Sequence, residues 1–304
     1  MVMTRQVTFR GWPHCQLLTN GTVEVIVTTD VGPRVVRYGL AGGPDVLCEV
    51  HAEDGLTGGD TWHTFGGHRL WHAPEASPRS YQPDGGPVAY EVQRDTILLR
   101  QEVEAATGIQ KELDITLADA GTEVTLVHRL TNRGLWPVRL AAWGITVMAP
   151  GGFAVVPQTT RDSGLLPNRC VALWPYASMD DARVHWGGRF VILRQDPEMQ
   201  APFKMGVTNE AGWAAYINAG TAFVERFPWV AGAEYPDFGV NCESYTTDFM
   251  LEMETLSPLQ TLQPGQSLEH SESWQLFTGV QLSARSREEE VASVLRETCG
   301  VLTG

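Results

Sequence analysis

The stretch that decides the fold is TEVTLVHRL, residues 122–130, in which polar and apolar residues alternate. Alternation with period two places every second side chain on the same face of an extended strand. The pattern recurs in short runs along most of the chain, rich in β-branched or aromatic residues and bounded by Gly, Pro, Asn or Asp. Such runs are typical of strands joined by turns, so we predict an all-β protein, a large antiparallel sandwich.

The clearest strands are expected at 22–28, 34–38, 96–103, 109–117, 122–130, 138–148, 189–194, 222–227, 249–255 and 267–277. Loops are expected at 56–67, 74–87, 151–170 and 229–241, which are rich in Gly, Pro and Asp. The run 261–277 reads as a closing hairpin that turns at Pro264 and Gly265. A short C-terminal helix is predicted over 286–299, because acidic residues open it and Gly300 can end it.

Composition limits the class of protein. The 304 residues are 43% hydrophobic and 19% charged, enough for a large core, and we predict one domain over 1–304. The net charge of −14 disfavours nucleic acid and anionic membranes as partners. No run of about 20 apolar residues occurs, and the N-terminal residues do not resemble a signal peptide, so we expect a cytoplasmic protein. The oligomeric state stays open.

The densest polar and aromatic cluster is TWHTFGGHRLWHAPE, residues 61–75. If the segment after the glycines is extended, His68 and His72 share one face, while Arg69 and Trp71 share the other. Two imidazoles on one face can act as acids or hydrogen-bond donors, although each can equally be a structural histidine. Four residues of strand separate these rings by roughly 13 Å, too far for one ion. We therefore expect no metal and no other cofactor. The one point left open is whether His63 and His68 together bind a metal ion, which depends on the loop between them.

A second cluster is acidic. Glu243 lies in GVNCESYT, and Glu252 and Glu254 follow in DFMLEMETLSP. Glu252 and Glu254 point the same way on a strand, and crowded carboxylates raise one another's pKa, as a general acid or base requires. The alternative is the solvent-facing side of a half-buried strand, which the pattern alone favours.

Aromatic residues in expected loops form the third feature. Trp174 and Tyr176 occur in LWPYASMDDAR. A pyranose offers an apolar CH face for stacking and a rim of hydroxyls for hydrogen bonding, so rings beside carboxylates and Arg suit a sugar site.

Several segments together resemble a bacterial family within the galactose mutarotase (aldose 1-epimerase) superfamily, over nearly the whole chain. They are LTNGTVEVIVTTDVGPRVVRYGL, FGGHRLWHAPE, HRLTNRGLWPVRLAAWGITVMAPGG, LWPYASMDDAR, YPDFGVNCESYT and LEMETLSPLQTLQPGQSLEHSESWQL. The resemblance implies a supersandwich of large antiparallel sheets with a carbohydrate cleft.

In that superfamily a late glutamate removes the anomeric proton and a histidine protonates the ring oxygen. Glu254 or Glu243 resembles this glutamate, and His68 or His72 resembles the acid. The resemblance implies that Arg69 binds a sugar hydroxyl. Trp143 stands where the mutarotases carry a second histidine, and a tryptophan stacks on a sugar but does not donate that proton.

We therefore expect a carbohydrate-active protein, an epimerase or isomerase of the aldose 1-epimerase type. The alternative is a non-catalytic carbohydrate-binding or sensing protein. A glycan lyase or hydrolase ranks last, because no helical barrel domain is indicated.

Overall fold

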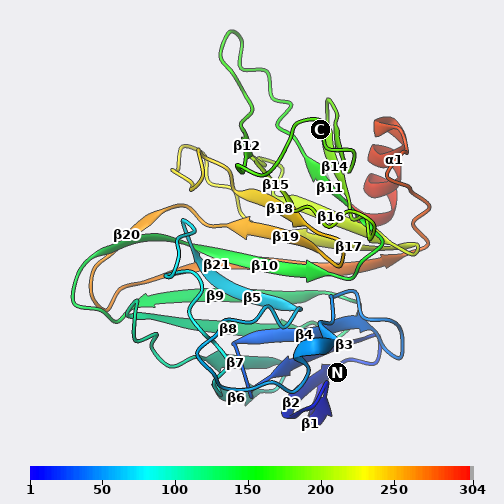
Figure 1. The fold of residues 1–304 in the computed structure, drawn as a ribbon. Coiled ribbons are helices and arrows are strands. Elements are labelled where there is room, and N and C mark those ends of the chain that lie inside the picture. The colour runs from blue at the N-terminus through cyan, green and yellow to red at the C-terminus, as the bar shows by residue number, and fades with distance from the viewer. Residues whose placement is uncertain (302–304) are drawn as a thin grey trace.

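The structure, a computed structural model, describes residues 1–301 as two large antiparallel sheets with one helix near the C-terminus (Figure 1). The first sheet follows the order β1-β2-β3-β4-β5-β10-β19-β18-β15-β12, and β20 pairs with β10. The second sheet follows the order β13-β14-β11-β16-β17-β21-β9-β8-β7-β6. The all-β class and the short helix predicted from the sequence are thus confirmed.

The strands of the first sheet are β1 (Met3–Phe9), β2 (Trp12–Thr19), β3 (Val23–Thr28), β4 (Arg34–Leu40), β5 (His68–Ala73), β10 (Val138–Met148), β12 (Val171–Leu173), β15 (Phe203–Val207), β18 (Cys242–Thr246), β19 (Leu251–Leu256) and β20 (Gln260–Leu262). Those of the second sheet are β6 (Ala89–Gln93), β7 (Thr96–Arg100), β8 (Ile109–Leu117), β9 (Val124–Asn132), β11 (Phe153–Pro157), β13 (Val184–Trp186), β14 (Phe190–Arg194), β16 (Trp213–Asn218), β17 (Thr221–Arg226) and β21 (Ser267–Thr278). A short 3₁₀ turn covers His51–Glu53.

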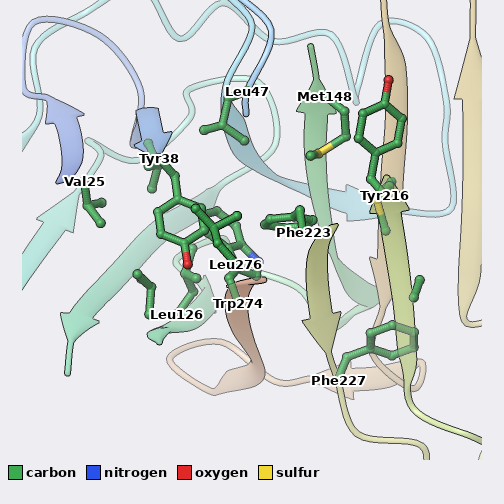
Figure 2. Packing of buried hydrophobic residues seen from close by; sticks show 14 of the residues in the cluster. Val25, Tyr38, Leu47, Leu126, Met148, Tyr216, Phe223, Phe227, Trp274 and Leu276 are labelled. Atoms are coloured by element: carbon green, nitrogen blue, oxygen red, sulfur yellow. The ribbon is translucent and has the colours of Figure 1, made fainter. Parts of the chain in front are cut away.

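The main hydrophobic core lies between the two sheets (Figure 2). Tyr38 of β4 reaches from the first sheet to Trp274 of β21, with ring centroids 5.8 Å apart, and Phe223 of β17 packs on the same indole at 5.5 Å. Burial of each such ring stabilises the fold by about 2 to 3 kcal/mol. The alternation seen in the sequence therefore turns one face of each sheet inward and leaves the other face for a second layer or for a ligand.

The helix α1 (Glu288–Cys299) covers the outer face of the second sheet. Its apolar side chains Val291 and Leu295 are buried there, and Gly300 ends the helix with a φ of 62°. The Glu288 carboxylate accepts hydrogen bonds from the backbone N–H groups of Arg189 and Phe190, at 2.8 and 2.9 Å, and so fixes the helix to β14. Within residues 1–301, no helix has the length and apolar character needed to cross a bilayer.

Two expectations about the chain path are wrong. The region 151–170 was expected to be a loop, but it contains β11, which is buried on both faces and so shows no alternation. The expected closing hairpin over 261–277 is not a hairpin, because β20 pairs with β10 of the first sheet while β21 pairs with β9 and β17 of the second. The turn at Pro264 and Gly265 carries the chain from one sheet to the other.

Candidate functional site

A cavity lies on the outer face of the first sheet, opposite the main core. Its floor comes from neighbouring strands β5, β10, β19, β18 and β15, and its rim from loops between strands. The volume is about 490 Å³. The lining residues are Trp62, Thr64, Arg69, Trp71, Glu75, Tyr81, Trp143, Trp174, Tyr176, Pro202, Lys204, Tyr245, Thr247, Phe249, Met250 and Glu252. This size falls within the range of small-molecule sites, and the lining combines rings with few charges.

Two glycines set the start of β5 and hence the side of the sheet on which its residues fall. Gly66 and Gly67 have φ of 72° and 69°, and a Cβ on Gly67 would lie 2.1 Å from the Val35 carbonyl oxygen. Only glycine tolerates both the left-handed backbone and this close approach. From there the strand alternates, so Arg69 and Trp71 face the cavity.

Six of the residues singled out in the sequence line this one cavity: Arg69, Trp71, Trp143, Trp174, Tyr176 and Glu252. Their strands are far apart in sequence but adjacent in the sheet, since β10 pairs with β5 on one side and β19 on the other. Whether these side chains bind a sugar stays a prediction.

Aromatic rings form one wall of the cavity. Trp71 packs edge-on against Trp62, Tyr81 and Trp143, with centroid distances of 5.2, 5.1 and 5.4 Å. This edge-to-face arrangement stabilises the cluster and holds the rings in fixed orientations. The wall therefore offers a rigid apolar surface.

An ion pair stands beside these rings. Arg69 Nη2 lies 3.0 Å from Glu252 Oε1, and the guanidinium carbon is 5.3 and 4.8 Å from the ring centroids of Trp62 and Trp71. Arg69 is 4% exposed, and its Nε and Nη1 have no hydrogen-bond partner in the structure. Buried donors without partners are costly.

Lys204 of β15 carries a second positive charge into the cavity. Its Nζ lies 2.9 Å from Glu243 Oε2 and 2.8 Å from Glu254 Oε2, and it sits 4.4 and 4.6 Å from the ring centroids of Trp143 and Trp174. The indole N–H of Trp143 also donates to Glu254 Oε2 at 2.8 Å. Glu243 and Glu254 are directly opposite each other on β18 and β19, so both reach the same ammonium.

The ionisation of this cluster follows from its burial. Burial alone would lower the pKa of Lys204, but the carboxylates of Glu243 and Glu254 outweigh it and raise that pKa above its usual range. Burial raises the pKa of both glutamates, while Lys204 opposes the rise, and the two carboxylates repel each other. One ammonium is shared by two carboxylates, so the protonation of each of these three groups depends on the other two.

The structure separates the predicted histidines from the cavity. His68 and His72 alternate with Arg69 and Trp71, so they point to the opposite face of the first sheet. His68 is fully buried between the sheets, where its Nε2 lies 2.7 Å from His128 Nε2. His72 lines a different cavity, 3.5 Å from Glu104. Neither histidine lines this cavity, and the catalytic role expected for His68 or His72 stays a prediction.

The remaining predicted groups also lie behind the cavity surface. Glu243 and Glu254 do not line it, because Lys204 and Trp143 stand between them and the open space. His63 and His68 do not meet either, since His63 pairs with Glu53 at 3.2 Å near the surface.

Sequence reasoning missed three lining residues that matter. Lys204 sits in FKMGV, where a single charge inside an apolar strand was the available signal. Tyr81 and Tyr245 carried no such signal, because a tyrosine in a loop or strand is common and only the tertiary fold places these two at the cavity.

No protein-family profile and no curated protein sequence matches the chain. Solved structures do match its fold. A candidate aldose 1-epimerase from Escherichia coli has a TM-score of 0.54 at 11% identity, over 91% of this chain and 99% of that one. A galactose mutarotase-like protein from Lactobacillus casei gives 0.55 at 8% identity, over 86% and 99%. A candidate aldose 1-epimerase from Klebsiella pneumoniae subsp. pneumoniae gives 0.57 at 10% identity, over 99% and 87%. With its two large sheets and single short helix, the chain has the galactose mutarotase-like fold.

Proposed function

We propose that the cavity binds a small carbohydrate. The observation that carries this proposal is the wall of edge-packed rings around Trp71, with the Arg69–Glu252 ion pair beside it. Rings supply the stacking surface for the CH face of a pyranose, and the charged pair supplies donors and acceptors for its hydroxyls. Structures of similar fold are described as mutarotase-like, which is consistent with a sugar ligand.

The proposal is tested with a ligand screen on the full chain. We expect a monosaccharide or disaccharide to raise the melting temperature and to show saturation-transfer NMR signals from one ring face. Trp174→Ala removes a lining ring and should weaken binding about tenfold, the loss of ~1.4 kcal/mol expected for one stacked ring. Trp136→Ala is the matched control, because Trp136 is 78% exposed and does not line the cavity. Equal losses in both variants, or no binding across aldoses, uronic acids and disaccharides, would contradict the proposal.

Epimerisation at the anomeric carbon is the second candidate. It is favoured by the Glu243–Lys204–Glu254 cluster, which places two carboxylates and an ammonium next to the cavity. In such a reaction Glu254 would take up the anomeric hydroxyl proton and a water molecule would protonate the ring oxygen, which opens the sugar, while Lys204, whose pKa is raised, would stay charged. No histidine is among the cavity-lining residues within 1–301, so the acid would differ from that of the mutarotases.

Binding ranks above catalysis because Glu254 is fully buried and already bonded to Lys204 and Trp143. Polarimetry or NMR exchange spectroscopy, with whichever sugar binds, distinguishes catalysis from binding alone. Catalysis predicts anomer interconversion faster than in buffer, with at least a hundredfold loss in Glu254→Gln. Binding without faster interconversion identifies a recognition protein.

A further inference from the structure

A polar cluster lies between the two sheets, outside the cavity described above. His68 of β5 belongs to the first sheet, and His128 of β9 and Glu272 of β21 belong to the second. Their imidazole nitrogens and carboxylate oxygens lie within 4.8 Å of one another, and all three residues are buried. Within residues 1–301 this is the only His, Cys, Asp and Glu group close enough to hold a metal ion.

The two imidazoles are oriented as metal ligands are. His128 Nδ1 lies 2.9 Å from the His270 carbonyl oxygen, which can only accept, so Nδ1 carries the proton and Nε2 carries a lone pair. His68 Nδ1 lies 2.9 Å from Thr146 Oγ1. In metal sites the second ring nitrogen commonly donates to such an oxygen and thereby points the first at the ion. Both Nε2 atoms here converge, at 2.7 Å.

The carboxylate is held in the same way. The Trp274 indole donates to Glu272 Oε2 at 3.0 Å, and the Thr255 hydroxyl donates to Oε1. The carboxylate reaches the first sheet only because residue 144 is glycine, since a Cβ there would lie 2.3 Å from Glu272 Oε1. These contacts leave one lone pair on each oxygen, so the carboxylate can still coordinate an ion.

Among the described residues, two buried carboxyl groups next to the cluster lack an Arg or Lys partner. Glu225 of β17 is fully buried, and its two carboxyl oxygens have no hydrogen-bond partner. Glu225 pairs with Trp274 of β21. Glu272 lies two residues before Trp274 and points to the same face, so the carboxyl groups of Glu225 and Glu272 are diagonal neighbours. In the described part of the chain neither forms an ion pair with an Arg or Lys, and the basic group near Glu272 is the imidazole of His270, whose Nε2 lies 4.0 Å from Oε1. Buried carboxyl groups normally pair with a cation or stay protonated.

We propose that His68, His128 and Glu272 bind a first-row divalent transition-metal ion that links the two sheets. Two imidazoles and one carboxylate suit Zn²⁺ or Fe²⁺ rather than Ca²⁺ or Mg²⁺, which prefer oxygen ligands. The ion replaces the short contact between the two Nε2 atoms, and both rings move apart by a few tenths of an ångström to reach bonding distances of about 2.0 to 2.1 Å. This proposal is independent of the sugar cavity.

The test uses Zn²⁺ and Co²⁺ with the full chain. Protein from zinc-supplemented growth should retain about one metal ion per chain after desalting, measured by inductively coupled plasma mass spectrometry. Removal of the ion by a chelator should lower the melting temperature by roughly 5 °C, and Zn²⁺ should restore it. Co²⁺ should give the strong visible absorption bands of a four- or five-coordinate site.

Variants then locate the ion. His128→Gln and Glu272→Gln should each lower the metal content at least tenfold, whereas His72→Gln, on the same face of β5 as His68, should retain it. Metal content unchanged in all three variants would place the ion elsewhere and overturn the proposal. So would wild-type protein with less than a tenth of an ion per chain and no response to Zn²⁺, because the His68–His128 contact is then a plain N–H···N hydrogen bond. If the two variants do not fold, the wild-type metal content and cobalt spectrum decide.

Discussion

Lys204→Met is the sharpest perturbation of the candidate site. Lys204 is 4% exposed and forms ion pairs with Glu243 and Glu254, which lie 2.9 and 2.8 Å from its Nζ. Methionine fills a similar volume but leaves two buried carboxyl groups without a cation. Breaking a buried ion pair by removing one partner costs about 3 to 5 kcal/mol, which lowers the melting temperature of a chain of this size by roughly 5 to 10 °C.

The loss should depend on pH. Burial raises the pKa of Glu243 and Glu254 above their ordinary value, and removal of Lys204 raises both further. A carboxyl whose pKa is raised by folding contributes full stability below its unfolded pKa and loses it as pH rises through the folded value. The destabilisation of Lys204→Met should therefore be small near pH 4.5 and should grow to its full size by pH 8.

Urea unfolding at pH 4.5, 6 and 8 measures this effect, with circular dichroism as the probe. The triple variant Lys204→Met, Glu243→Gln, Glu254→Gln is the control, because it removes the charges together and should recover most of the lost stability at pH 8. A loss below about 1 kcal/mol at pH 8, or an equal loss at all three pH values, would show that the ammonium does not neutralise these carboxylates.

Three further predictions concern the scaffold. Burial raises the pKa of Asp45 to about 7, so wild-type stability should fall between pH 4 and 8; Asp45→Asn should match wild type at pH 4 and exceed it at pH 8 by up to about 4 kcal/mol in urea unfolding. Gly67→Ala should cost at least about 2 kcal/mol by the same measurement, because its Cβ would meet the Val35 carbonyl oxygen at 2.1 Å; Gly42→Ala, with φ of 71° and no neighbour within 4 Å, separates this clash from backbone strain. Tyr216→Phe should cost about 1 to 3 kcal/mol, since its hydroxyl donates to the Ala149 carbonyl at 2.6 Å and accepts from the Gly152 N–H at 2.9 Å; a thermal melt within 1 °C of wild type would refute that.

The sequence predicted the strands because period-two alternation directly reflects burial on one face. The strand β11 escaped this signal, because it is buried on both faces and its sequence, FAVVP, has no polar positions. The expected hairpin of β20 and β21 is wrong because a turn sequence between two strands does not by itself mean that the strands pair. A short turn after a strand normally reverses the chain within one sheet, and only the packing of two sheets tells that Pro264 and Gly265 join them.

The same alternation explains which site residues were found. Arg69 and Trp71 share a face by spacing, and the cavity confirms that they lie on the same side of β5. The acid assigned to His68 or His72 came from resemblance, which fixes neighbourhood along the chain but not the side of the sheet on which a side chain emerges. A shift of one residue in a strand exchanges its two faces, so the histidines of HRLWH fall in the interior when Arg69 faces the cavity.

That exchange of faces gives β5 two separate tasks. The side chains of Arg69 and Trp71 shape the cavity, while His68 on the reverse face meets His128 of the second sheet. Because one strand carries the cavity residues and His68, its register must suit the cavity on one face and the histidine contact on the other. The glycines before the strand fix this register, since a Cβ on Gly67 would collide with β4. A change in the contacts of His68 under the floor of the cavity would therefore also move Arg69 and Trp71 above it.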